Sequence, residues 1–293
     1  ISANVRKRFS PDGLVVVKGR GQVGDLVVGE VIADAEASVT VFDQDLKSRV
    51  LQSTTRVLAV LGTRMSTTHV NAGIPSGGLE IVEGTEAHWI AGESGLVGLL
   101  VHEANPDTPY KAETSVGFRC LGLVARPSGE VVNLASLAVE PASAELTTPL
   151  LLIGATAAEV GKTTLVKKIL GYLVAVGRRV AAVKVTGTGG TMDSQAHREA
   201  GAFMAVDQVD AGLITTYCEP ATFRQRILRS FLFAQDHDPD LILGELGGDL
   251  TFANNPTFLR MTEIRENLQG LVAYRYKHFC HEGGISSPLL VHW

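Results

Sequence analysis

The sequence predicts an α/β protein in which a doubly wound, mainly parallel sheet is preceded by a smaller β-rich domain. Up to about residue 148, short apolar runs are separated by turns containing glycine and proline. From Leu150 onward, apolar runs instead alternate with amphipathic stretches of helical length. The first pattern is typical of all-β domains and the second of parallel sheets. We therefore expect two domains, residues 1–148 and 149–293, with ample chain to bury a core.

The first half is expected to form a small barrel or sandwich without a long amphipathic helix. Its strands are predicted at Leu14–Lys18, Leu26–Ile32, Val39–Phe42, Val57–Leu61, Leu96–His102, Gly117–Val124 and Val131–Leu137. Turn signals such as Pro75-Ser76-Gly77-Gly78 separate these strands. The segment Pro141–Pro149, which is rich in alanine, serine and threonine, is interpreted as the linker between the two domains.

The second half is predicted to be a parallel sheet with helices on both faces. In chain order we expect strand Leu150–Ile153, helix Lys162–Val176, strand Arg179–Val185, a helix near Asp193–Val206, strand Ala211–Thr215, helix Pro220–Asp236, strand Leu241–Leu246, helix Pro256–Asn267 and strand Leu271–Tyr274. Regular strand–helix–strand alternation of this kind builds a doubly wound sheet. Arg275–Trp293 has little periodic character, so the C-terminal region is expected to be abbreviated.

The strongest functional signal is the segment Leu150–Leu165, LLLIGATAAEVGKTTL, in which an apolar strand leads into a loop ending in Gly-Lys-Thr-Thr. It follows the phosphate-loop pattern G-x-x-x-x-G-K-[ST], except that Thr156 replaces the first glycine. Lys162 is expected to reach the β- and γ-phosphates of a nucleoside triphosphate, and the Thr163 hydroxyl to bind Mg²⁺. A chance Gly-Lys-Thr at a helix start is the alternative. The predicted nucleotide-binding residues are Thr156, Glu159, Val160, Gly161, Lys162, Thr163 and Thr164.

Two more predicted strands end in charged residues, at the edge of the sheet where open α/β folds bind ligands. Lys184 lies near the end of one strand, and a lysine in an apolar strand is expected to emerge facing an anion. Asp193 follows it and is a candidate Mg²⁺ ligand. Glu245 ends another strand and is a candidate for the acidic residue that holds Mg²⁺ or its water. Glycines after both strands would let the backbone approach a ligand. A surface turn at Lys184 and a solvated strand end at Glu245 are the alternatives.

Other polar residues give weaker signals. Asp207 and Asp210 flank a predicted turn, where they are candidates for substrate binding or for capping. His197 and His237 are isolated in the sequence, so structural or exposed roles are expected for both. No group of His, Cys, Asp and Glu residues has the spacing of a metal site in the sequence.

Composition and charge exclude several classes of function. The chain has a formal net charge of −5 and no basic block, which argues against nucleic-acid and membrane-surface binding. Its longest apolar runs are too short to span a membrane, and no signal peptide is visible. The three cysteines are widely separated and are expected to be free thiols, which favours a reducing, cytoplasmic location.

The motifs together resemble dethiobiotin synthetase, a P-loop family in a wider group with the cobyrinate amidases and the accessory proteins of molybdopterin-guanine cofactor metabolism. That family also has Thr where Thr156 stands. Its lysine on the second strand, the Ser or Thr four residues later, its magnesium-binding Asp and its strand-end Glu match Lys184, Thr188, Asp193 and Glu245. The resemblance covers roughly residues 150–250 and implies an ATP- and Mg²⁺-dependent site. A poorly characterised bacterial P-loop family is also similar, through its Lys-x-Thr-Gly-Thr-Gly segment. Nothing in dethiobiotin synthetase corresponds to the β-rich half, so its substrate is not carried over.

The leading hypothesis is a kinase or ligase that transfers the γ-phosphoryl group of ATP to a carboxylate or hydroxyl of a small acidic metabolite. Its candidate catalytic residues are Lys162, Lys184 and Thr188, and its candidate Mg²⁺ ligands are Thr163, Asp193 and Glu245. The alternatives are a nucleotide-hydrolysing switch or cofactor-biosynthesis accessory protein whose N-terminal domain docks a partner, and a catalytically poor nucleotide-binding regulator. Lys184 with Thr188 favours the enzyme, because a switch needs no second cation beside an acceptor. The choice between ATP and GTP and the oligomeric state, a homodimer included, are left open.

Overall fold

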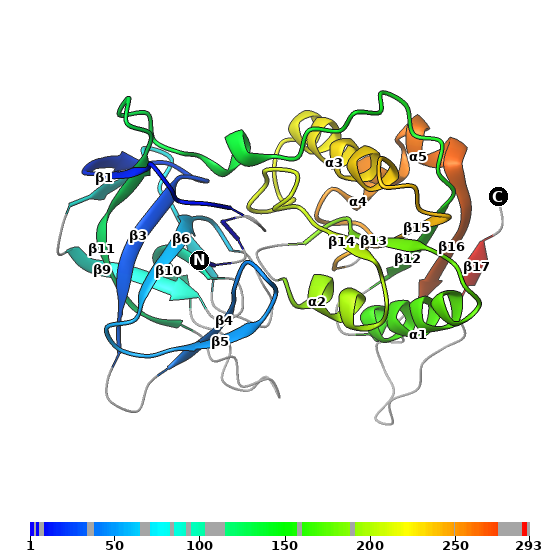
Figure 1. Ribbon diagram of the computed structural model, residues 1–293, viewed down its shortest axis with the longest axis horizontal. Helices are drawn as coiled ribbons and strands as arrows, with labels where there is room; N and C mark the ends of the chain where they lie inside the picture. The colour runs from blue at the N-terminus through cyan, green and yellow to red at the C-terminus, as the bar shows by residue number, and fades with distance from the viewer. Residues whose placement is uncertain are drawn as a thin grey trace. The chain divides into compact units, whose positions relative to one another are not determined.

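The computed structural model (Figure 1) describes residues 1–2, 4–5, 9–33, 38–64, 71–82, 85–91, 95–102, 115–156, 160–187, 191–248, 250–274 and 289–291. Within this part of the chain, two compact units form. Unit 1 holds Ile1–Ala138 with two short segments from further along the chain, residues 191–192 and Gly212–Thr215. Unit 2 holds the other described residues from Val139 onward. The first boundary thus lies after Ala138, whereas the sequence places it after residue 148.

Unit 1 is built on a closed ring of five strands. The ring consists of β3 (Leu26–Ile32), β6 (Arg56–Leu61), β9 (Thr85–Ala91), β10 (Leu96–His102) and β11 (Ser115–Ala125). It closes because β11 pairs with β3, β3 with β6, β6 with β10, β10 with β9, and β9 again with β11. Of the two predicted all-β forms, the barrel is therefore the one observed. Only the β6–β10 pair in this ring is parallel.

Smaller strands extend this barrel. β1 (Val15–Val17) pairs with β11, and β7 (Asn71–Gly73) pairs with β10. Two further pairs consist of β2 (Gly19–Gly21) with β8 (Leu79–Ile81), and β4 (Val39–Phe42) with β5 (Ser48–Leu51). The core of the unit, among the described residues, is mostly aliphatic and includes the fully buried ring of Phe118.

The predicted strand Val131–Leu137 is wrong over most of its length. Val131 forms only an isolated bridge, and Leu134–Leu137 is the short 3₁₀-helix η1. The reason is Asn133, whose side-chain oxygen accepts a hydrogen bond from the backbone N–H of Ala135 at 2.9 Å. An asparagine that caps a turn in this way competes with strand pairing.

Unit 2 is an α/β unit whose sheet has the strand order β14-β13-β15-β12-β16-β17. Its strands are β12 (Leu150–Ala155), β13 (Val180–Lys184), β14 (Met204–Val206), β15 (Leu241–Glu245), β16 (Leu268–Tyr274) and β17 (Leu289–Val291). The first five are mutually parallel, and β17 runs antiparallel to β16. The structure therefore confirms the predicted α/β class with a mainly parallel sheet.

Helices cover both faces of this sheet. They are α1 (Lys162–Ala175), α2 (Met192–Glu199), α3 (Pro220–Gln235), α4 (Asn255–Leu259) and α5 (Thr262–Asn267). In Figure 1, α1 and α2 lie on one side of the strands, and α3, α4 and α5 on the other. On the α1 face, Val166 and Leu170 pack with strand residues such as Ile153 and Leu243. On the α3 face, the ring of Phe231 stacks on that of Phe258 with centroids 5.4 Å apart. No helix among the described residues is long and apolar enough to cross a membrane.

The order of the strands places a switch in winding direction between β12 and β15, which are neighbours. From β12 the chain crosses through α1 to β13, toward the β14 edge of the sheet. From β15 it crosses through α4 and α5 to β16, toward the other edge. Ligands of open α/β sheets bind outside the carboxyl ends of the strands at such a point.

Three predicted elements of the second half are wrong in detail. The helix near Asp193–Val206 ends at Glu199, because the chain turns at Gly201, whose φ of +105° favours glycine, and the following residues form β14. The predicted strand Ala211–Thr215 contains turns and bends, because β14 takes its place in the sheet. The predicted helix Pro256–Asn267 is two helices, separated where Met261 adopts extended backbone angles.

The segment interpreted as a linker, Pro141–Pro149, belongs to unit 2 and is attached to the end of α3. The carboxylate of Asp236 accepts hydrogen bonds from the backbone N–H of Ala142, at 2.6 Å, and from Ser143. The side-chain oxygen of Gln235 accepts from the backbone N–H groups of Thr147 and Thr148, at 2.7 and 2.9 Å. These contacts satisfy the backbone of an irregular segment, which therefore runs along the unit rather than between two domains.

Two glycines, one inside α1 and one just after it, allow the same substitution to be compared in two backbone conformations. Gly171 lies inside the helix and Gly177 follows it with φ +82°, and a Cβ atom at either position would meet nothing within 4 Å. We expect Gly171→Ala to raise the free energy of unfolding by about 0.5–1 kcal/mol. Gly177→Ala should lower it by about 1 kcal/mol, since the left-handed conformation disfavours a Cβ. Urea unfolding measures both, and equal effects of the two changes would contradict this assignment.

Candidate functional site

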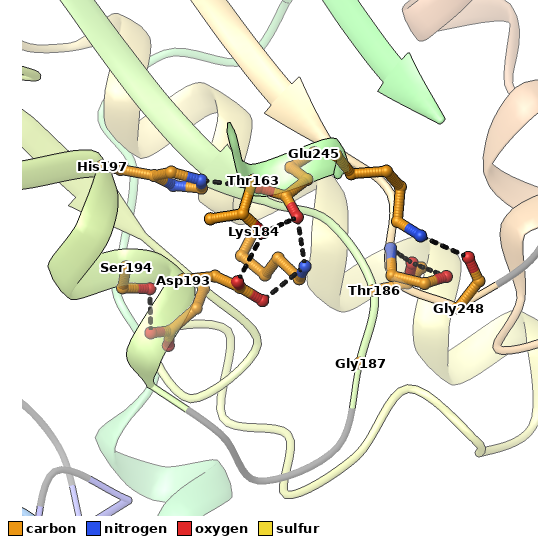
Figure 2. A network of polar contacts seen from close by, with 12 residues as sticks. Thr163, Lys184, Thr186, Gly187, Asp193, Ser194, His197, Glu245 and Gly248 are labelled. Atoms are coloured by element: carbon orange, nitrogen blue, oxygen red, sulfur yellow. Dashed lines mark hydrogen bonds and ion pairs between the residues drawn. The ribbon is translucent and has the colours of Figure 1, made fainter. Parts of the chain in front are cut away.

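The carboxyl ends of β13 and β15, the first turn of α1 and the helix α2 bring a group of charged and polar side chains together in unit 2 (Figure 2). The group contains Thr163, Lys184, Asp193, His197 and Glu245. Four of these five are residues that the sequence singles out for nucleotide or metal chemistry, and the fifth, His197, is one that it treats as isolated. The group lies where the winding of the sheet changes direction, at the end of β15 beside β12.

Glu245 is the centre of the group. Its side chain is 1% exposed, and both of its carboxylate oxygens are engaged. Oε1 accepts hydrogen bonds from the Thr163 hydroxyl and from the Lys184 ammonium, each at 2.8 Å. Oε2 lies 2.8 Å from Nε2 of His197. The alternative of a solvated strand end is therefore wrong, because this carboxylate is buried and bonded on both sides.

Lys184 stands directly opposite Glu245 in the parallel register of β13 and β15. Its ammonium lies 2.8 Å from Oε1 of Glu245 and 2.5 Å from Oδ2 of Asp193, so it bridges the two carboxylates. The residue does emerge facing anions, as the sequence predicts, but these anions belong to the protein. The alternative of a surface turn is wrong for Lys184, whose side chain is 9% exposed.

Burial and charge act in opposite directions on these groups. Burial alone would lower the pKa of Lys184, but the charges of Asp193 and Glu245 outweigh it and raise that pKa above its usual value. Burial alone would raise the pKa of Glu245, but the Lys184 charge and the His197 contact hold it well below its usual range. Lys184 and Glu245 are therefore both ionised across the physiological range.

Thr163 joins the first turn of α1 to this ion pair. Its hydroxyl oxygen lies 2.8 Å from Oε1 of Glu245 and 2.9 Å from Oδ1 of Asp193. A hydroxyl carries a single proton, so it can donate to only one of these two carboxylates at a time. The hydroxyl oxygen of Thr163 and one oxygen of each carboxylate thus lie close together, and the ammonium of Lys184 contacts both carboxylates. Clusters of hydroxyl and carboxylate oxygens are ligands that Mg²⁺ accepts.

Lys162, the lysine of the predicted phosphate loop, is largely buried, and its ammonium donates to the carbonyl oxygen of Gly248 at 2.9 Å. The side chain therefore reaches from the start of α1 to the loop after β15. Gly161 precedes it at the N-cap with φ +91°, a conformation that favours glycine. Because Gly161 has no side chain, the N-cap residue offers nothing to cap the first N–H groups of α1, whose partial positive charge favours an anion.

The remaining predicted nucleotide-binding residues are placed as follows. Thr156 and Thr164 are exposed and Val160 is half-buried. Glu159 and Thr188 lie outside the described residues, as do the two glycines at positions 189 and 190.

Gly247, the first glycine after Glu245, lies close to the backbone of Thr186. A Cβ atom on Gly247 would lie 2.1 Å from the carbonyl oxygen of Thr186. The Gly247 N–H donates to the Thr186 hydroxyl at 2.8 Å, and its carbonyl accepts from the Asn255 side-chain amide at 2.8 Å. The sequence predicts a close approach to a ligand here, whereas the contact ties the ends of β13 and β15 together.

Asp207 and Asp210 lie at the end of β14 and cap a turn. An oxygen of Asp207 accepts from the backbone N–H of Val209 at 3.0 Å, and Asp210 accepts from the backbone N–H of Asp207 at 2.9 Å. The Ser194 hydroxyl also donates to Asp207, at 2.7 Å. Of the two roles left open by the sequence, capping is the one the contacts support. His237 is exposed just after the end of α3, with Nδ1 2.8 Å from the Phe233 carbonyl.

His197 is the site residue that sequence reasoning missed. It is fully buried, and it lies on α2 four residues after Asp193. Residues four apart share one face of a helix, so the spacing of Asp193 and His197 within the helix predicted near Asp193–Val206 was the available signal.

Among the described residues, no group of three or more His, Cys, Asp or Glu side chains is arranged to hold a metal ion. The oxygens that could do so are the two carboxylates with the Thr163 hydroxyl. A scan against protein-family models and a search of curated protein sequences gave no match to this chain.

The ion pair predicts a distinctive dependence of stability on pH. Lys184→Met leaves the buried Glu245 carboxylate beside Asp193 without its cation, and losing one partner of a buried pair costs about 3–5 kcal/mol. In wild type, the folded protein holds the pKa of Glu245 below its usual value. Ionised Glu245 therefore stabilises the fold at every pH above that usual value, and this stabilisation is lost only as the pH falls through the lowered pKa. In the variant, burial should instead raise the pKa of Glu245. The folded variant then takes up a proton that the unfolded chain does not hold, so its deficit should shrink between about pH 7 and pH 5.

Urea unfolding of wild type and variant over this pH range measures the deficit. The exposed Lys168 provides a matched control, since Lys168→Met should have a small effect that does not vary with pH. The double change Lys184→Met with Glu245→Gln should reduce the deficit and remove most of its pH dependence. A deficit of Lys184→Met that stays constant from about pH 7 to pH 5 would show that Lys184 does not control the ionisation of Glu245.

Proposed function

We propose that this protein is an ATP- and Mg²⁺-dependent phosphoryl-transfer enzyme of the kinase or ligase type, acting on a small acidic metabolite. The observation that carries the proposal is the contact of Thr163, in the predicted phosphate loop, with two carboxylates, those of Asp193 on α2 and Glu245 at the end of β15. Thr163, Asp193 and Glu245 lie far apart in the sequence, and each is a candidate there for a different reason. In the fold they meet within hydrogen-bonding distance, where the winding of the sheet changes direction. Phosphoryl transfer needs such positioning and charge stabilisation more than it needs a nucleophile of the protein.

The residues divide the work by their charge. Lys162 and the first N–H groups of α1 would receive the phosphates, since both offer positive charge near the end of β12. Thr163, Asp193 and Glu245 would hold Mg²⁺, which when bound neutralises charge on the phosphates. Oxygen donors of this kind fit Mg²⁺, but in the chain as described the Lys184 ammonium lies against both carboxylates. Lys184 would meet the transferred group or its acceptor only after leaving one or both of them.

The pairing of Lys184 with Asp193 and Glu245 also supports a second candidate function, that of a nucleotide-hydrolysing switch. A nucleotide-hydrolysing switch or accessory protein would need the phosphate loop and the metal ligands but no cation for an acceptor. Because Lys184 is neutralised by two carboxylates of the protein, its presence in the site does not by itself require an acceptor. The preference for the enzyme therefore depends on whether a metabolite receives the phosphoryl group.

Nucleotide binding is tested by Lys162→Ala. Saturating Mg-ATP at about 100 times Kd should stabilise wild type by about 2.7 kcal/mol and so raise its Tm. The variant should show almost no shift, because the phosphate loop loses the ammonium at the start of α1. The shift is compared for each protein with and without nucleotide, since Lys162→Ala also removes the bond to Gly248. Lys167→Ala, at an exposed position of the same helix, is the control and should keep the wild-type shift. An undiminished shift in Lys162→Ala would refute the phosphate-loop assignment.

Phosphoryl transfer is tested with a mixture of small carboxylic and hydroxy acids, Mg-ATP and hydroxylamine. An acyl phosphate formed on a carboxylate is trapped by hydroxylamine as a hydroxamate, and a phosphorylated hydroxyl gains the mass of a phosphoryl group. Mass spectrometry should detect one of these products with wild type and none with Lys162→Ala. Release of inorganic phosphate from ATP with no modified acid would instead support the switch.

A further inference from the structure

The imidazole of His197 contacts the central carboxylate of the site at the oxygen that Thr163 and Lys184 leave unused. Its Nε2 lies 2.8 Å from Oε2 of Glu245, while Oε1 of the same carboxylate faces Thr163 and Lys184. Figure 2 shows the ring on one side of Glu245 and the ammonium of Lys184 on the other. An ionised carboxylate only accepts hydrogen bonds, so Nε2 must carry the proton in this contact.

This contact restricts the rotation of the Glu245 side chain. Rotation about its last bond would exchange Oε1 and Oε2, or turn both away from Thr163. A donor fixed on Oε2 opposes that rotation, and the ring is itself fixed because it is fully buried on α2. The same helix carries Asp193, so one element holds one carboxylate and orients the other.

An ordinary core histidine explains the burial less well than this role does. The Nδ1 atom of His197 is buried and has no hydrogen-bond partner among the described residues. A buried polar atom without a partner is unfavourable, and an apolar side chain at this position would avoid it. What an apolar side chain could not provide is the donor for Oε2.

We propose that His197 is a positioning residue that holds the Glu245 carboxylate in the orientation needed to bind Mg²⁺ together with Thr163. The inference rests on the proposed function, because it concerns the same carboxylate and the same metal. A donor behind a ligating carboxylate fixes its direction, and loss of such a partner weakens metal binding while leaving the other ligands in place.

The experiment measures metal binding rather than turnover. Titration calorimetry follows a non-hydrolysable ATP analogue at a series of Mg²⁺ concentrations and in EDTA. His197→Phe removes the donor, and His197→Gln keeps an amide N–H that can reach Oε2. Glu245→Gln serves as the reference for a lost ligand, and His237→Phe as the control for loss of a histidine from the end of α3.

In His197→Phe the Mg²⁺ concentration for half-maximal enhancement of analogue binding should rise about tenfold, the effect expected for loss of a metal's outer partner. His197→Gln should restore it to near the wild-type value, and His237→Phe should not change it. Affinity for the analogue in EDTA should be the same in all of these proteins. A purely structural role would not separate the Mg²⁺-dependent from the Mg²⁺-independent binding. If His197→Phe folds and needs no more Mg²⁺ than His237→Phe does, the inference is wrong.

A second measurement on the wild-type protein covers the case in which His197→Phe does not fold. Nitrogen-15 spectra of the histidine rings should show His197 with its proton on Nε2, and its signal should shift when Mg²⁺ is added with the analogue, whereas that of His237 should not. If analogue binding requires Mg²⁺ but the His197 signal does not shift when Mg²⁺ is added, the inference about His197 is wrong and the proposed function still stands. Analogue binding that is absent or indifferent to Mg²⁺ in wild type overturns the proposed function instead.

Discussion

The arrangement of the site depends on the burial of one carboxylate, that of Glu245. A charged group that is 1% exposed is stable only if its oxygens are satisfied by donors and its charge by a cation. Lys184 supplies the cation, and Thr163 and His197 supply further contacts. These three residues belong to three different elements. The need of Glu245 for partners therefore fixes β13, α1 and α2 relative to the end of β15.

The backbone around the carboxylate is held as tightly as the side chains. The hydrogen bond between the Gly247 N–H and the Thr186 hydroxyl ties the loop after β15 to the loop after β13 at a distance that admits no Cβ. Asn255, at the start of α4, strengthens this connection, since its side chain accepts a hydrogen bond from the Thr186 hydroxyl and donates one to the Gly247 carbonyl. Charged groups that must keep their mutual distances to within a few tenths of an ångström need a rigid frame of this kind, because side chains on mobile loops lose their geometry.

The electrostatics of the site also bear on the two proposals. Positive charge from Lys162 and the start of α1 lies near the end of β12. Beside it lie the carboxylates of Glu245, buried at the end of β15, and of Asp193, on α2. The first set suits phosphate and the second suits a divalent cation, which is the pairing that a metal–nucleotide complex requires. Lys184 complicates this division, since its single positive charge already lies against both Glu245 and Asp193. The orientation of Glu245 by His197 then matters, because a carboxylate shared between an ammonium and a metal ion must present a defined oxygen to each.

The sequence by itself determined most strands and helices of unit 2 and the strand ends at which charged groups emerge, because apolar periodicity and glycine placement are local properties of the chain. It also selected Thr163 and Glu245 correctly as neighbours in space. Only the tertiary structure decided that Lys184 would face two carboxylates of the protein, since that pairing depends on the register between β13 and β15, whose residues are 61 positions apart. The same holds for His197, which is isolated along the chain and meets Glu245 only because α2 packs beside β15. Partners that are distant in sequence leave no periodic signal, and only the folded sheet brings them within hydrogen-bonding distance.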